Sequence, residues 1–237
     1  MVSTRSLAAA LIITLLVSIQ VSAITPDRGL ENPLLLSEIG YGSLVYGSFN
    51  LDTQHYLVSY AEYDVFAEGH GAFIYQVGQD DEADIFSFVG TKELDHTQVG
   101  FTLHRFSNPV SEWLVDLGVA YTAGDLVARV AVHSIPLSDI EQIHERSSIS
   151  VGAAVNLADL VLVGLDARLQ EQQYEGYVVL EPRPDFTLRF SLRSNADKWD
   201  KAGFDLWYTR DRLIGHVAVV MSQNWQRDIR LGFGIRF

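Results

Sequence analysis

The sequence predicts an all-β protein, an antiparallel transmembrane β-barrel of about 14 strands, with 12 as the alternative count. Three observations lead to this fold class. From Tyr41 onward, short runs alternate apolar and polar residues, as strands do when their side chains point to two faces. Polar turn residues separate these runs, and almost no helical periodicity is present. The chain also ends on Phe237, which completes a strand with one wholly apolar face.

Residues 1–23 predict a secretory signal peptide. Arg5 precedes the apolar run "LAAALIITLLVSI", and Val21 and Ala23 fit a cleavage site. An uncleaved anchor is the alternative, but this run is shorter than the roughly 20 residues that a spanning helix needs. We therefore expect export across the inner membrane with cleavage after Ala23. A short segment at 24–39, which could tuck into the barrel, and the barrel itself at 40–237 would follow.

The composition excludes several classes of protein. The chain has 0 cysteines, so a disulfide framework and thiolate metal sites are excluded. It carries 30 acidic against 17 basic residues, a net charge of −13, which argues against a nucleic-acid partner. It has no Gly-x-Ser-x-Gly, His-Glu-x-x-His or phosphate-loop motif, so we expect no enzyme activity, no metal and no cofactor.

The alternation of apolar and polar residues is clearest in five segments of the chain. In "WLVDLGVAYT", alternate residues from Trp113 to Tyr121 are apolar or aromatic, while Asp116, Gly118 and Ala120 lie between them. The segments "LVARVAVH", "SISVGAAVNL", "VLVGLDARL" and "DFTLRFSLRS" repeat the arrangement. The strands are expected to start near residues 41, 54, 71, 84, 97, 112, 125, 147, 160, 173, 186, 201, 213 and 228.

A soluble β-sandwich also alternates apolar and polar residues, so the membrane assignment needs separate support. Aromatic residues recur near strand ends, where a membrane interface would hold them: Trp113, Tyr121, Tyr174 and Tyr208. The connections also alternate in length. Short turns such as "AGD", "LAD" and "RDR" alternate with longer loops such as "GQDDEAD", "SNPVSE", "SNADKWD", "QNWQRD" and "IPLSDIEQIHER". This alternation indicates short periplasmic turns, longer outer loops and a location in the bacterial outer membrane.

The last strand predicts an assembly signal. Its apolar face consists of Ile229, Leu231, Phe233, Ile235 and Phe237. A terminal aromatic residue after apolar residues at every second position is what an outer-membrane barrel presents to its assembly machinery. We therefore expect outer-membrane lipid and, during insertion, the barrel assembly machinery as partners. A component of an envelope or secretion complex is a third candidate partner.

Charged residues in the middle of strands predict the lining of the lumen. The expected inward charges are Arg129, Arg168, Arg189, Arg193, Arg230, Arg236, Asp116, Asp166 and Asp205. Because buried charges must pair or meet water, they either fill the barrel as ion pairs or line a pore as a basic strip. His104, His133 and His216 are expected to be ordinary lumen or rim residues, since nothing in the sequence brings a serine and a carboxylate beside them.

Several stretches resemble the long-chain fatty-acid transporter superfamily of outer-membrane barrels, which includes the shuttle barrel of the type IX secretion system. They are the N-terminal "ENPLLLSEIGYGSLVYGSFN", the later "SVGAAVNLADLVLVGLDARL" and the final "LGFGIRF". Asn32 and Pro33 match the family's Asn-Pro-Ala segment, and Leu34 replaces the alanine. The resemblance implies an outer-membrane barrel. The segment at 24–39, however, is too short for the folded hatch of the family's transporters.

Two functions follow from these observations. Compact loops and the missing hatch favour a structural or accessory barrel in an envelope or secretion complex, which is the first hypothesis. Inward arginines favour the alternative, a transporter or narrow pore for small or amphipathic, fatty-acid-like solutes.

Overall fold

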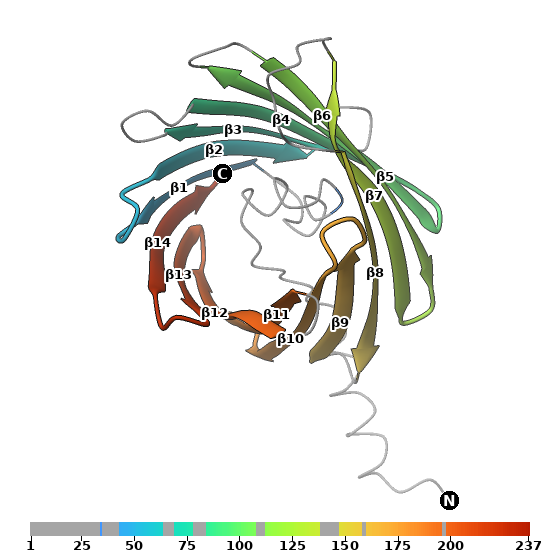
Figure 1. Ribbon diagram of the computed structural model, residues 1–237. Helices are drawn as coiled ribbons and strands as arrows, with labels where there is room; N and C mark the ends of the chain where they lie inside the picture. Colours follow the sequence, from blue (N-terminus) through green and yellow to red (C-terminus); the bar gives the residue numbers. More distant parts are fainter. Residues whose placement is uncertain are drawn as a thin grey trace, which may run out of the picture.

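The protein is a closed antiparallel barrel of 14 strands (Figure 1). The computed structural model describes residues 34, 43–63, 69–77, 84–107, 112–137, 147–157, 160–195 and 198–237. Each strand pairs with the next along the chain, and β1 pairs with β14 to close the barrel. The strands are β1 Ser43–Asn50, β2 Tyr56–Tyr63, β3 Gly69–Val77, β4 Asp84–Leu94, β5 Thr97–Ser107, β6 Glu112–Ala123, β7 Leu126–Pro136, β8 Ser148–Leu157, β9 Val161–Arg168, β10 Gln173–Arg183, β11 Phe186–Asn195, β12 Lys198–Arg210, β13 Leu213–Ser222 and β14 Arg227–Arg236. The predicted fold class is confirmed.

The strand boundaries follow the alternation in the sequence closely. Every predicted start lies within 3 residues of an observed one, and the alternative count of 12 is wrong. The largest difference is at "SNADKWD", which we expected to be a long outer loop. Instead β11 runs to Asn195 and β12 begins at Lys198, because a register shift at Arg193 and Ser194 lets the two strands continue pairing.

The two ends of the barrel differ in their turns. We call the end where β1 begins and β14 ends the terminal rim, and the opposite end the loop rim. Several hairpins at the terminal rim are closed by two residues, and three of these turns hold a residue with positive φ: Asp95 (53°), Gly124 (60°) and Asp211 (54°). Two-residue hairpin turns need such angles because their twist then matches that of the strands, and Gly and Asp tolerate them.

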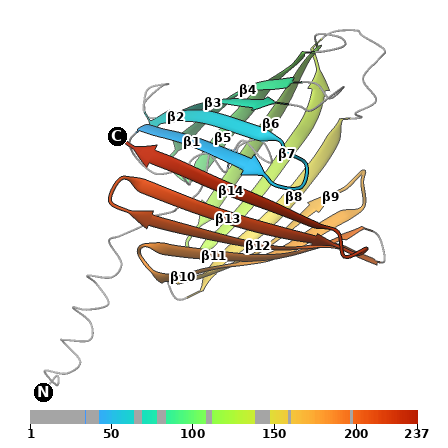
Figure 2. The same ribbon diagram turned by 90° about the vertical axis from the view of Figure 1, so that its left-hand side faces the viewer.

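The outer face of the barrel is apolar. Leu117, Val119, Phe190 and Leu192 are 49%, 50%, 46% and 54% exposed, whereas Arg189 on the opposite face of β11 is 7% exposed. Figure 2 shows the strands inclined side by side around the wall, so that these outer faces join into one surface. Such a closed wall satisfies the backbone hydrogen bonds internally and places apolar side chains where lipid would contact them.

The N-terminal predictions fall mostly on residues that the structure does not describe. The signal peptide at 1–23 lies outside the described residues, and so does the segment at 24–39 apart from Leu34. Leu34 is 3% exposed, and its carbonyl accepts a hydrogen bond of 2.8 Å from Gln98 Nε2. Its side chain packs against Gly118 on the inner face of β6. Among the described residues, no helix is long and apolar enough to span a bilayer.

Candidate functional site

The inner face of the barrel has an apolar part on β1–β4 and β13. We call it the apolar wall, and it consists of Leu44, Tyr46, Leu57, Ala61, Ala72, Ile74, Val89 and Ile214. Each of these residues is buried, the most exposed being Leu57 at 7%. Side chains that face a wide, water-filled channel would be exposed, so this side of the lumen is packed.

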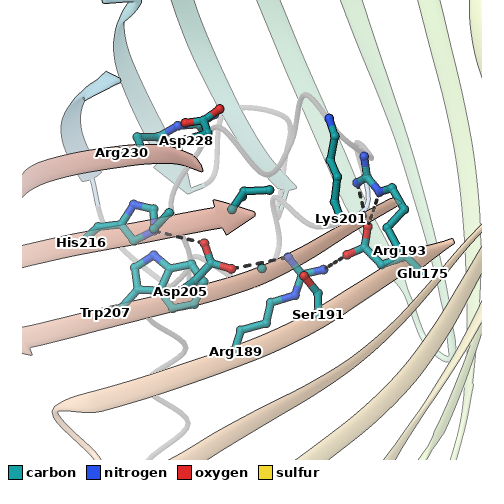
Figure 3. Close-up of a pocket in the computed structure, with 13 residues that line it drawn as sticks. Glu175, Arg189, Ser191, Arg193, Lys201, Asp205, Trp207, His216, Asp228 and Arg230 are labelled. Carbon is teal, nitrogen blue, oxygen red and sulfur yellow. Dashed lines mark hydrogen bonds and ion pairs between the residues drawn. The ribbon is translucent and has the colours of Figure 1, made fainter. Parts of the chain in front are cut away.

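The inner face of β10–β14 is polar and hollowed (Figure 3). A cavity of about 200 Å³ lies against it, and we call it the polar cavity. It is lined by Glu175, Arg189, Ser191, Arg193, Lys201, Gly203, Asp205, Trp207, His216, Ala218, Val220, Asp228 and Arg230. Four of these side chains are cationic and three are anionic, so the lining carries a small positive excess.

Glu175 of β10 is the centre of the ion pairs in the polar cavity. Arg189 donates to its Oε1 at 2.7 Å, and Arg193 donates to its Oε2 from Nε at 3.1 Å and from a terminal nitrogen at 2.7 Å. Such charge-assisted bonds are among the stronger ones in proteins. Asp205 lies 3.9 Å from Arg189. The prediction from sequence missed Glu175, although the alternation of β10 places it on the same face as Tyr177.

Two buried donors around the polar cavity, Arg189 Nε and Trp207 Nε1, have no hydrogen-bond partner in the described part of the chain, and their residues are 7% and 3% exposed. His216 is 5% exposed, and its Nε2 lies 3.6 Å from Asp205 Oδ1, within ion-pair distance but too far for a hydrogen bond. The rings of Trp207 and His216 stack at 4.8 Å, and Tyr46 Oη lies 2.8 Å from His216 Nδ1. Buried polar groups are nearly always satisfied, so this cluster has unused capacity to bind acceptor oxygens.

The remaining charges of the predicted lining form separate pairs. Arg129 bonds Asp166 at 2.9 Å from its Nε and Tyr177 Oη at 2.7 Å. Arg168 lies 3.6 Å from Glu171 near the loop rim. Arg230 lines the polar cavity, while Arg236 closes β14 with its backbone nitrogen 2.7 Å from Arg212 O. Four of the six predicted arginines, Arg129, Arg168, Arg189 and Arg193, therefore face a carboxylate, which a continuous unpaired basic strip would not show.

His104 and His133 belong to a chain of polar side chains on five adjacent strands, β4–β8. We call this chain the polar relay, and it consists of Ser87, His104, Asp116, His133 and Ser150. Ser87 Oγ lies 2.9 Å from His104 Nδ1, and His104 Nε2 lies 3.5 Å from Asp116 Oδ2. On the other side, His133 Nδ1 lies 3.1 Å from Asp116 Oδ2, and His133 Nε2 lies 2.8 Å from Ser150 Oγ.

Nothing in the sequence indicated a serine and a carboxylate beside these histidines, but the structure places both beside His104 and His133. His216, the third of them, also meets a carboxylate, with Asp205 Oδ1 3.6 Å from its Nε2. The relay residues lie on successive strands, and the register between these strands brings them together. Among the described residues, no group of three or more His, Asp or Glu side chains is arranged to hold a metal ion.

The apolar residues of the last strand lie on the outer face. Leu231, Phe233, Ile235 and Phe237 are 43%, 54%, 37% and 70% exposed, and Ile229 precedes them in the same alternation. Their role in assembly stays a prediction, as do the partners proposed from the sequence.

Comparison of the sequence with known proteins finds no matching family model and no curated protein that matches it. The structure, in contrast, is similar to solved outer-membrane barrels. The outer membrane protein Omp33 of Acinetobacter baumannii shares 12% identity at a TM-score of 0.62, over 83% of this chain and 98% of that one. The KdgM porin shares 11% at 0.50, over 82% of this chain and 99% of that one.

A mutant of the Rh. blastica porin gives the same picture, with 10% identity and a TM-score of 0.51 over 83% of this chain and 98% of that one. At these identities the likeness concerns the fold alone. The finer resemblance to the fatty-acid transporter superfamily stays a prediction. The chain has the fold of outer-membrane β-barrel porins.

Proposed function

We propose that this chain is an outer-membrane barrel that lets small solutes bearing carboxylate or similar oxyanion groups pass through a narrow lumen. The observation that carries the proposal is the polar cavity. It combines a positive excess of side chains with two buried donors, Arg189 Nε and Trp207 Nε1, that lack an acceptor among the described residues. A cavity with this lining raises the local concentration of anions, because fixed charge in a low-dielectric wall acts strongly on mobile ions.

Two further observations support a place in the outer membrane. The apolar outer face would be costly in water and stable in lipid. The similar structures bear names that describe an outer membrane protein and two porins, and we extend that role to this chain.

A structural or accessory barrel is the second candidate function. The buried apolar wall and the paired charges around Glu175 and Asp166 favour it, since both are typical of a filled barrel. The two candidates differ in conduction, because only the first needs a continuous path for solutes.

Lys201 is the best residue with which to test the proposal. It lines the polar cavity but takes no part in the bonds of Arg189 and Arg193 to Glu175. Lys198, an exposed residue of the same strand, is not part of the cavity lining and provides a matched control. Lys201→Gln and Lys198→Gln remove the same charge at the two places.

The measurement is planar-bilayer recording of the purified, folded protein under a KCl gradient. We expect the wild type to conduct with a preference for chloride, Lys201→Gln to shift the reversal potential toward potassium, and Lys198→Gln to leave it unchanged. An absence of conductance from folded wild-type protein would instead support the accessory barrel.

A further inference from the structure

The polar relay arranges Ser150, His133 and Asp116 as a nucleophile, a base and an orienting acid. An ionised carboxylate can only accept hydrogen bonds, so Asp116 Oδ2, 3.1 Å away, selects the tautomer of His133 that carries its proton on Nδ1. The Nε2 lone pair then faces Ser150 Oγ at 2.8 Å and can accept its proton. This order of contacts activates serine in enzymes of unrelated folds.

The acid is held by backbone as well as by side chains. Ser134 N donates to Asp116 Oδ1 at 2.8 Å. Ser134 has a φ of 55°, which is rare for a non-glycine residue, and the register of β6 and β7 shifts at this point. A bulge with a left-handed residue therefore turns this amide toward Asp116, and bulges and left-handed residues are enriched near functional sites.

Ser150 is more exposed than the buried members of the relay. Ser87, Asp116 and His133 are 1%, 4% and 5% exposed, whereas Ser150 is only partly buried. His104 also presents the opposite ring nitrogens, Nδ1 to Ser87 and Nε2 to Asp116. His104 thus contacts Asp116 on the side away from His133, and His133 links Asp116 to Ser150, which faces the lumen.

The position of Ser150 limits its substrate. Its neighbours Ile149 and Val151 are each 36% exposed on the outer face, so Ser150 points into the lumen and away from lipid. Arg168 is its register partner on β9 and therefore shares the inner face. A guanidinium beside the nucleophile can stabilise an oxyanion.

We propose that Ser150 is the nucleophile of an esterase site that hydrolyses small, water-soluble carboxylic esters in the lumen. Ser150 Oγ bonds to the ester carbonyl carbon, and its proton moves to His133 Nε2. The ester C–O bond then breaks, and the alcohol leaves with that proton. Water attacks the acyl-serine while His133 takes its proton, which returns to Ser150 Oγ as the carboxylic acid is released. Asp116 is a positioning residue. This activity departs from the sequence-based expectation of a non-enzymatic barrel.

The test uses the full chain folded in detergent micelles, a fluorophosphonate probe with peptide mapping, and p-nitrophenyl acetate as substrate. We expect the probe on Ser150 of the wild type and ester hydrolysis faster than that of Ser150→Ala by about 10²-fold or more. Asp116→Asn should lower kcat more than it changes KM, because it affects the tautomer of His133 rather than binding.

Ser148→Ala is the matched control, since Ser148 lies on the same face of the same strand and is not a member of the relay. It should keep both labelling and hydrolysis. Heat-dependent gel mobility checks that the Ser150→Ala barrel is folded. Its bilayer conductance should equal that of the wild type, so that loss of hydrolysis can be distinguished from loss of the pore. A folded wild type that is unlabelled at Ser150, or that hydrolyses the ester no faster than Ser150→Ala, would overturn the esterase site.

Discussion

At the scale of single residues, glycines on the inner face make room for large polar side chains. A Cβ at Gly152 would overlap Asp166 and press on Arg129, and one at Gly164 would overlap the ring of Tyr177. Because Arg129 bonds to both Asp166 and Tyr177, these two glycines make room for the ion-pair site although they contribute no group to it. Glycines in strands often mark such close approaches.

Gly152→Ala should therefore destabilise the barrel. The added methyl group forces Asp166 and Arg129 apart, and overpacking of this kind costs about 1–3 kcal/mol. Gly176→Ala is the control, since a Cβ there meets no atom within 4 Å. Its effect should stay within about 0.5 kcal/mol. Urea titration of folded protein in lipid vesicles measures both changes, and equal effects of the two substitutions would contradict this role of Gly152.

At the scale of elements, the contact between β1 and β14 determines whether the barrel closes. The two strands pair from Leu44 opposite Arg236 to Asn50 opposite Arg230. The seam is extended by Phe237 N, which donates to Ser43 O at 2.9 Å, and by Asn50 Nδ2, which donates to Asp228 at 2.6 Å. An open edge in lipid would leave backbone groups unpaired, at a cost of several kcal/mol for each.

The last residue can be tested in two ways that separate its side chain from its backbone. Deleting Phe237 removes both the aromatic ring and the bond to Ser43 O, whereas Phe237→Asp replaces the ring with a carboxylate and keeps the backbone bond. We expect both variants to fail to accumulate in the outer membrane, and Phe237→Tyr to accumulate as the wild type does. Membrane fractionation and heat-dependent gel mobility give the readout. Normal accumulation of Phe237→Asp would show that the aromatic signal is not required.

At the scale of the whole molecule, the barrel has an apolar outside and a divided interior. The outer face carries large exposed side chains such as Leu117 and Phe190. Inside, the packed apolar wall on β1–β4 and β13 differs from the charged face of β10–β14, which holds the polar cavity. The polar cavity therefore lies on the charged side of this divided interior.

If the outer face spans a bilayer, a charged substitution should cost more near the middle of a strand than at the rim of the barrel. Leu117 lies in the middle of β6, so Leu117→Arg should lower the free energy of unfolding by about 2–4 kcal/mol. Leu160, 56% exposed in the turn before β9, lies at the terminal rim, where Leu160→Arg should cost about 0–1 kcal/mol. Unfolding titrations in vesicles compare the two variants, and equal costs would mean that this face does not span the bilayer.

The alternation of the sequence was enough to predict about 14 strands, although 12 stayed open, most of their boundaries, and the faces to which Leu117 and Arg189 point. These are local properties, because a period of two residues and a turn residue with positive φ act within a few positions of the chain. The same reasoning predicted inward charges, but it could not tell which acid each arginine would meet.

The pairings were decided by the tertiary structure. Glu175 meets two arginines of β11, Tyr46 reaches His216 across 170 positions of sequence, and His133 lies between Asp116 and Ser150. Each contact depends on the register between strands, and the contact of Tyr46 with His216 also depends on the closure of β1 against β14. Register is set by the packing of whole strands around the barrel, so no single segment contains the information that brings these side chains together.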